Sequence, residues 1–187
     1  MTDTTTTLDV PGYKAGTWVL DPAHSEVTFS LRHMMISKVR GEFGLKSATI
    51  EAPANPLEAT VTASVDAASI STGDQNRDNH LRSADFFDVE TYPTIDFVST
   101  GVRYEGGDFL VDGDLTMHGV TKPVTFELEF GGFGTDPYGN YKAGATAKTV
   151  VNREDFGLTW NAALESGGVL VGKDVTITLD LQGSIEA

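Results

Sequence analysis

Four histidines and two arginine clusters are the residues of this sequence best suited to chemistry. The histidines are His24, His33, His80 and His118. No two of them have the H-x-H or H-x-x-x-H spacing of a local metal motif, so a metal site would need ligands from distant parts of the chain. We therefore predict no metal and no other cofactor. We expect His24 to bond a neighbouring backbone group and His118 to have a local role at a hairpin.

Arg77 and Asp78 form the first arginine cluster, in the segment TGDQNRDNHLRSADFFDVETYP at 72–93. On an exposed helix, such neighbours make solvated pairs of little energetic value. If the segment covers a cavity, the Arg77 guanidinium instead suits a phosphate or carboxylate head group. The second cluster, Arg153-Glu154-Asp155, would serve in the same way or would brace the mouth of the cavity through ion pairs.

Recognised catalytic motifs are missing from the sequence. We find no G-x-S-x-G, S-x-x-K, P-loop or H-E-x-x-H pattern. The chain has no cysteine, which excludes disulfides, thiolate zinc sites and cysteine nucleophiles. We therefore predict a protein that is not an enzyme.

The charge balance argues against two classes of partner. With 27 acidic and 13 basic residues the net charge is −14, and the bases form no stripe that would suit nucleic acid. Anionic membrane surfaces are disfavoured for the same reason. No apolar run approaches the roughly 20 residues of a membrane span, so we expect no stable membrane insertion.

The elements that must position these residues are β-strands. Apolar and polar residues alternate in most of the chain, as where Val27, Phe29, Leu31 and His33 share one face. Period-two alternation indicates half-buried antiparallel strands, and we count roughly eight or nine of them. Residues 105–108 and 118–123 are typical of hairpin connections. A sheet with one apolar face must bury it, which predicts an all-β, closed barrel of about eight strands.

The apolar face carries many small residues, which leaves two interpretations. Either they leave room for an apolar ligand in a hollow barrel, or they lie where the barrel narrows or a helix packs on it. The small residues are Gly41, Ala59, Ala63, Gly113, Ala143, Ala145 and Ala147.

The segment at 72–90 interrupts the alternation and predicts a short helical crossover over one barrel end. Thr72 or Asp74 would cap a helix, and Ser83 would cap a second turn. Leu81, Phe86 and Phe87 provide apolar anchors.

His33 lies on the predicted inner face, where a neutral imidazole needs a hydrogen-bond partner. That partner is either another part of the protein or the polar end of a ligand.

The beginning of the chain has neither the basic nor the apolar region of a secretory signal, which predicts a cytoplasmic location. We expect residues 1–16 to form a flexible N-terminal arm and residues 17–187 to form one domain.

The sequence resembles the YceI-like family of polyisoprenoid-binding proteins. The similar stretches are WVLDPAHSEVTFSLRHMMISKVRGEF at 18–43, STGDQNRDNHLRSADFFDVETYPTIDF at 71–97, GDLTMHGVTKPV at 113–124 and NREDFGL at 152–158. The resemblance implies a lipocalin-like antiparallel barrel that holds a long isoprenoid or fatty chain in an apolar tunnel. Many members of the family carry a secretory signal, and the family supplies no catalytic residue set.

We therefore predict a carrier or store for a long-chain isoprenoid or similar lipid, such as a quinone, with a possible homodimer formed through an exposed sheet face. Two alternatives stay open. One is an enzyme that uses His33 with Asp78 or Asp155 as acid and base. The other is a stress or structural protein whose barrel is filled by its own side chains. The predicted ligand-binding residues are Phe29, Leu31, His33, Phe43, Val61, Ala63, Arg77, Asp78, Leu81, Phe86, Phe97, Leu115, Phe126 and Leu179.

Overall fold

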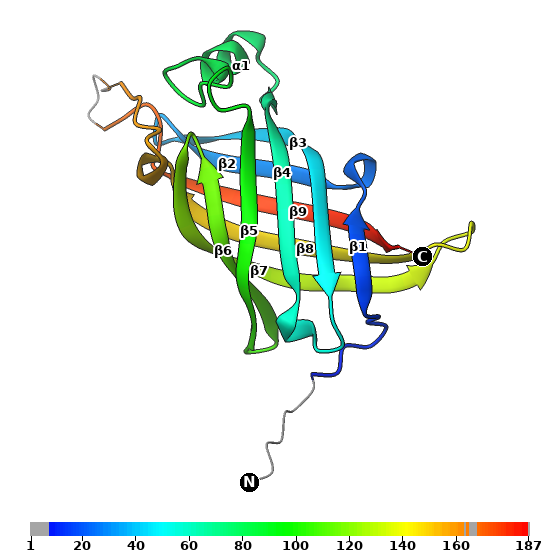
Figure 1. The fold of residues 1–187 in the computed structure, drawn as a ribbon. Helices are drawn as coiled ribbons and strands as arrows, with labels where there is room; N and C mark the ends of the chain where they lie inside the picture. The colour runs from blue at the N-terminus through cyan, green and yellow to red at the C-terminus, as the bar shows by residue number, and fades with distance from the viewer. Residues whose placement is uncertain (1–7, 163, 165–167, 187) are drawn as a thin grey trace.

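The computed structural model describes residues 8–162, 164 and 168–186. Within them the chain forms nine strands, one α-helix and three short 3-10 turns (Figure 1). The helical elements are α1 (Gln75–Arg82), η1 (Pro22–His24), η2 (Pro56–Glu58) and η3 (Arg153–Phe156). The strands are β1 (Gly16–Leu20), β2 (Glu26–His33), β3 (Ser37–Ala52), β4 (Thr60–Ser71), β5 (Thr94–Glu105), β6 (Asp108–Met117), β7 (Val120–Thr135), β8 (Tyr141–Asn152) and β9 (Asp174–Ile185).

The strands close into an antiparallel barrel. Their order is β1-β3-β2-β9-β8-β7-β6-β5-β4, and the pairing of β3 with β4 joins the two ends of the sheet. Both β1 and β2 lie between β3 and β9, so together they fill one position in the wall. Nine strands therefore occupy eight positions, which confirms the predicted closed barrel of about eight strands.

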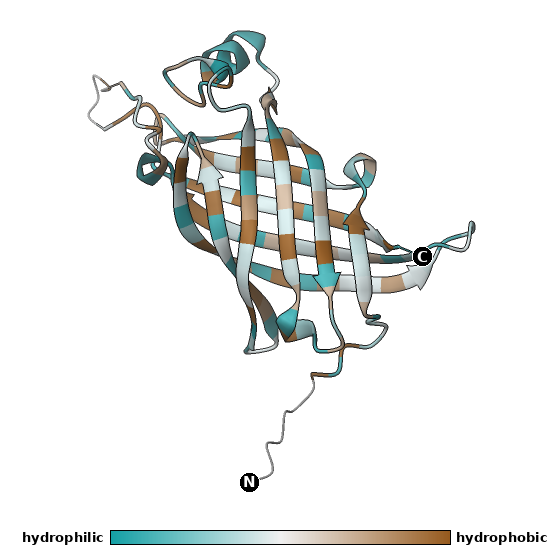
Figure 2. Cartoon of the chain, viewed as in Figure 1, coloured by the Kyte–Doolittle hydropathy of each residue, from teal (hydrophilic) through white to brown (hydrophobic). Residues whose placement is uncertain are grey.

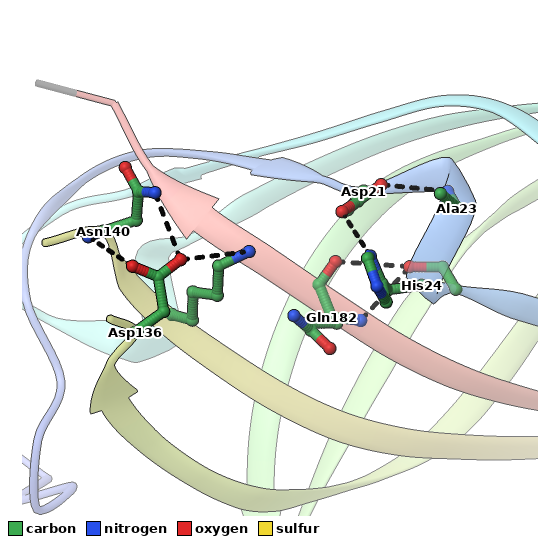
Figure 3. Close-up of polar contacts among 8 residues, drawn as sticks. Asp21, Ala23, His24, Asp136, Asn140 and Gln182 are labelled. Carbon is green, nitrogen blue, oxygen red and sulfur yellow. Dashed lines mark hydrogen bonds and ion pairs between the residues drawn. The ribbon is translucent and has the colours of Figure 1, made fainter. Parts of the chain in front are cut away.

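A short break separates β1 from β2. The last β1 pair with β9 is Leu20 with Gly183, and the first β2 pair is Glu26 with Asp180. Across the gap, the hydroxyl of Ser25 donates to the Gln182 carbonyl at 3.2 Å and accepts from the Gln182 N–H at 3.2 Å (Figure 3). The backbone groups of β9 therefore keep partners where no strand lies beside them.

Asp21 begins the turn that crosses this gap. Its carboxylate accepts from the Ala23 N–H at 2.9 Å and lies 2.7 Å from Nδ1 of His24 (Figure 3). The hydrogen bond with His24, followed by that with Ala23, lowers the pKa of Asp21. Our expectation for His24 was wrong, because its ring pairs with a side-chain carboxylate three residues back and not with a backbone group.

The turn between β7 and β8 is built around Asp136. Its carboxylate accepts from the backbone N–H groups of Tyr138 and Asn140, both at 2.9 Å. Figure 3 shows the contact with Asn140. Hydrogen bonding to the Asn140 backbone is the main cause that lowers the pKa of Asp136. Such a side-chain-to-backbone bond is the usual way for Asp to stabilise a tight turn.

Hydropathy alternates along the strands, as the bands in Figure 2 show. At the end of the barrel opposite α1, the inner face holds a group of aromatic rings that we call the aromatic plug. Ring centroids within it lie 5.3–6.3 Å apart, which is the usual range for favourable aromatic pairs. Its members are Trp18, Phe109, Phe130, Phe133 and Tyr141.

Small residues of β8 face the plug. Ala145 pairs with Phe130, and Ala143 pairs with Phe133. Gly41 and Gly113 lie under the rings of other phenylalanines in the same manner. At Gly41 and Gly113, the idea that small side chains leave room for a ligand is wrong, because neighbouring rings already occupy the space. Ala143 and Ala145 do not line the cavity either.

The helix α1 covers one end of the barrel, and the N-terminal segment emerges at the other (Figure 1). Asp74 caps the helix by accepting from the Arg77 N–H at 3.1 Å. Arg82 fixes it to β4 by donating to the carbonyls of Ala68 and Ile70, at 2.9 and 3.0 Å. The predicted helical crossover between β4 and β5 is therefore confirmed.

Part of the expected N-terminal arm, residues 1–7, lies outside the described residues. The part that follows contacts the barrel. The hydroxyl of Tyr13 donates to the Pro53 carbonyl at 2.5 Å, and Nζ of Lys14 lies 3.8 Å from the centre of the Tyr141 ring.

Candidate functional site: an apolar cavity in the barrel

The barrel encloses a cavity of about 540 Å³. Its wall is formed by the inward faces of all nine strands and, at one end, by α1, the segment that follows α1 and the connection between β8 and β9. A volume of this size is typical of pockets that enclose one small ligand. The interior is therefore not filled by its own side chains, which argues against the filled-barrel alternative.

Every predicted ligand-binding residue except Asp78 lies on this wall. Period-two alternation was sufficient to place the strand residues, and it also accounts for wall residues outside our prediction, such as Val39, Ile177 and Leu181. The small residues Ala63 and Ala147 do line the cavity. Contact of these residues with a ligand stays a prediction.

The two ends of the cavity differ in chemistry. At the end near the aromatic plug, the wall consists of aliphatic side chains such as Leu20, Leu128 and Leu181. At the α1 end, polar side chains join the wall, among them His33, Asn76 and Arg77. An elongated molecule with one polar end would therefore fit in one orientation.

Arg77 is held in place by Thr72, the residue after β4. Its Nε donates to the Thr72 hydroxyl at 2.7 Å, and its Nη2 donates to the Thr72 carbonyl at 2.9 Å. No hydrogen bond to a described residue involves its Nη1. The fixed guanidinium therefore keeps donors available on the cavity wall.

Asp78 supports this arrangement from outside the cavity. Its carboxylate accepts from the N–H and the hydroxyl of Thr72, at 2.9 and 2.6 Å. Asp78 is buried, but it does not line the cavity. Among the predicted ligand-binding residues, Asp78 is therefore the one that the structure does not place on the wall, because successive residues on a helix point in different directions and Arg77, not Asp78, is turned towards the cavity.

His33 ends β2 on the cavity wall. Its carbonyl accepts from the Ile36 N–H at 3.2 Å, but its ring makes no hydrogen bond within the described part of the chain. In particular, no hydrogen bond joins the ring to Asp78 or to the exposed Asp155. The acid–base pairs considered from the sequence are thus not assembled here.

An aromatic cluster connects α1 to the β8–β9 connection at the cavity end. The His80 ring meets Phe86 and Trp160 edge to face, with centroids 5.0 and 4.8 Å apart. The other side of His80 pairs with Asp85, with Nε2 2.9 Å from the carboxylate. His80 and Trp160 both line the cavity, and our sequence reasoning missed them. Trp160 lies in an irregular connection, where no periodic pattern marks the inner face.

Arg153 is almost fully buried beneath the same connection, with 3% of its surface exposed. Its guanidinium donates to four carbonyls, those of Leu158, Trp160, Val171 and Gly172, at 2.5–3.2 Å. Burial lowers the pKa of Arg153. Arg153 therefore braces the α1 end of the cavity, which we call the cavity mouth. It does so through backbone carbonyls and not through the ion pairs that we considered.

The remaining histidine, His118, has a local role. It lies in the turn between β6 and β7, and its Nδ1 donates to the Phe156 carbonyl at 3.0 Å, as expected for a structural residue at a hairpin.

Among the described residues, no three histidine or acidic side chains gather in a way that could hold a metal ion. The one described α-helix is too short to cross a membrane.

Comparison with known proteins places the barrel among characterised folds. The family model described as the YceI-like domain matches residues 18–183. A UPF0312 protein of Staphylococcus aureus is 38% identical over 170 residues, which cover 90% of this chain and 97% of that protein.

Solved structures show the same fold. Burkholderia cenocepacia BcnA is 24% identical with a TM-score of 0.75, over 87% of this chain and 98% of that one. The Campylobacter jejuni YceI protein is 26% identical with a TM-score of 0.70, over 84% of this chain and 91% of that one. A polyisoprenoid-binding domain from Saccharophagus degradans is 16% identical with a TM-score of 0.66, over 92% of this chain and 100% of that one.

Proposed function

Because this chain belongs to the YceI-like family, we propose that its barrel binds one long apolar lipid along the cavity, for carriage or storage. The observation that carries this proposal is the apolar cavity of about 540 Å³ with one polar end. The Saccharophagus degradans neighbour is described as polyisoprenoid-binding, which makes a polyisoprenoid our first candidate ligand, ahead of an isoprenoid quinone or a fatty chain.

The driving force for binding is the burial of apolar surface. Removing apolar area from water contributes about 25 cal/mol per Å² before the cost of ordering the ligand. Phe29, Phe97 and Phe126 provide broad contact surfaces on the wall, and the aliphatic strand residues fill the space between them. Such a wall selects for apolarity and shape and does not distinguish closely related chains.

The polar end of the ligand lies at α1 in this proposal. Arg77 and His33 are the donors that we assign to it, because both line the cavity there and neither has all of its polar atoms engaged by described residues. A guanidinium binds a phosphate or carboxylate through charge-assisted hydrogen bonds. In this proposal the protein binds the molecule without converting it, and the described residues of the wall hold no hydrogen-bonded pair of nucleophile and base that would favour a reaction.

Native mass spectrometry of the purified protein tests the proposal, with organic extraction of any co-purifying molecule. We expect either a stoichiometric adduct with the mass of a prenyl or fatty chain, or uptake of one added farnesol or palmitate molecule. Ala63→Trp should abolish that uptake, because Ala63 lines the cavity. Thr62→Trp is the matched control, because Thr62 is exposed on the outer face of the same strand. A folded wild-type protein that takes up neither lipid, or an Ala63→Trp variant that binds as the wild type does, contradicts the proposal.

A further inference from the structure

The turn between β2 and β3 presents three consecutive apolar side chains to solvent. Met34, Met35 and Ile36 are 42%, 61% and 78% exposed. Turns at the end of a hairpin ordinarily carry polar residues or glycine. The exposed apolar run is therefore a feature that the fold itself does not require.

The backbone of this turn makes the choice of residues more informative. Met34 and Met35 have φ values of 52° and 61°, and the Ile36 N–H donates to the His33 carbonyl across the turn. Two successive positive φ angles favour Asn–Gly and are unfavourable for long side chains. The sequence thus keeps two methionines where the backbone disfavours them, which points to a role for their side chains.

A second segment extends the apolar surface. The Met34 N–H donates to the Leu170 carbonyl at 2.7 Å, and a side chain at Gly168 would meet the sulfur of Met35. Between them Val169 is 40% exposed. We call Met34, Met35, Ile36 and Val169 the apolar tip. His33 and Leu170, which adjoin it, line the cavity, so the tip lies at the cavity mouth.

Basic residues surround the apolar tip. Arg32 and Lys38 pair across the hairpin, Arg40 follows on the outer face of β3, and the N–H of Gly172 next to Lys173 donates to the Arg32 carbonyl. All four basic side chains are exposed, and none forms an ion pair within the described residues. Residues 27–41 contain no acid, although the whole chain carries a net charge of −14.

We propose that the apolar tip and its four bases dock the cavity mouth on the surface of an anionic lipid bilayer. A convex apolar tip enters the interface, and long basic side chains extend from it to lipid phosphates. The overall negative charge does not prevent this, because charges farther away than a Debye length of about 8 Å are screened at physiological salt. This docking goes beyond lipid binding in the cavity and is measured separately from it.

Vesicle flotation tests this inference, with vesicles of phosphatidylcholine alone or with about one third phosphatidylglycerol. We expect the wild-type protein to float with the anionic vesicles and to be released by added salt. The variant Met34→Asn/Met35→Gly/Ile36→Thr should bind at least about tenfold more weakly, because it removes the apolar side chains. Its turn residues suit positive φ, so its thermal unfolding midpoint should be equal or higher.

Tyr138→Ser is the matched control, since Tyr138 is 88% exposed in the β7–β8 turn. It should float as the wild type does. The triple variant should still take up farnesol from solution, which separates failure of docking from failure of cavity binding. The inference is overturned by a wild-type protein that floats with neither vesicle, and by a triple variant that floats normally. A tip that instead joins two copies of the chain, seen as a variant-dependent change in mass by light scattering without flotation, also overturns it.

Discussion

The ring of Phe29 on β2 occupies the space in which a side chain on Gly41 of β3 would begin. The two residues pair across the strands, and a Cβ at position 41 would lie 2.4 Å from Cζ of the ring. Phe29 therefore keeps its position on the cavity wall because its partner has no side chain.

We expect Gly41→Ala to displace the Phe29 ring and to lower the free energy of unfolding by about 1–3 kcal/mol, as overpacked sites do. Chemical denaturation measures this effect. Gly44→Ala is the control, because the nearest atom to an added Cβ there is a serine hydroxyl at 3.4 Å. If Gly41→Ala is as stable as Gly44→Ala, the close contact does not constrain the ring.

Arg153→Met should strongly destabilise the cavity mouth. The change leaves four carbonyls of the β8–β9 connection without their donor, and buried groups without partners are costly. We expect the free energy of unfolding to fall by about 2–4 kcal/mol. Arg103→Met, which removes ion pairs with Glu105 and Asp112 on the barrel surface, should cost much less, because exposed ion pairs contribute little to stability. Equal losses in the two variants would contradict the bracing role.

Arg77 should set the preference for a charged head group. We expect wild-type protein to bind farnesyl phosphate more tightly than farnesol, because a held guanidinium donates to the phosphate. In Arg77→Met this preference should shrink by about ten- to a hundredfold, the value of a hydrogen bond to a charged group. Competition against a fluorescent fatty acid gives both affinities in one assay. A preference that the substitution leaves intact would place the head group elsewhere.

Acid should weaken the outer face of β6 through Asp112. Hydrogen bonds from Arg103 and then from Thr125 lower its pKa from 3.8 to about 2. A carboxyl with a depressed folded-state pKa contributes stability above its unfolded pKa and loses it as the pH falls. The contribution of Asp112 should therefore disappear between pH 3.8 and about 2. In that range, Asp112→Asn should flatten the pH dependence of unfolding compared with Asp114→Asn, whose target lies exposed on the same strand. Identical slopes would rule out this assignment.

The barrel and much of its inner wall could be predicted because both depend on local pattern. Ala63, Phe126 and Leu179 were placed inside by alternation alone, and the pleat of a strand enforces that alternation. The helix at 75–82 was predictable from its Asp74 cap and from the interruption of the strand pattern.

The parts that escaped prediction depend on register and on irregular backbone. That Gly41 and Ala145 lie beside aromatic rings follows from which residues pair across strands, and composition does not reveal this. Trp160 reaches the cavity from a connection without a repeating pattern. Two acids follow Arg153, and we therefore considered ion pairs for it. Its guanidinium instead donates to four backbone carbonyls of the irregular β8–β9 connection, and backbone groups leave no mark in the sequence.

The break between β1 and β2 divides the closure of the barrel into two independent units. β2 closes the end with α1 and the mouth, whereas β1 closes the end with the aromatic plug. Because proteins open locally in contiguous units, β1 can detach from β3 and β9 while every pair of β2 stays formed. Detachment of β1 would therefore open the plug end while the α1 end stays closed, and the tail of the lipid that we propose would lie at the end that β1 closes.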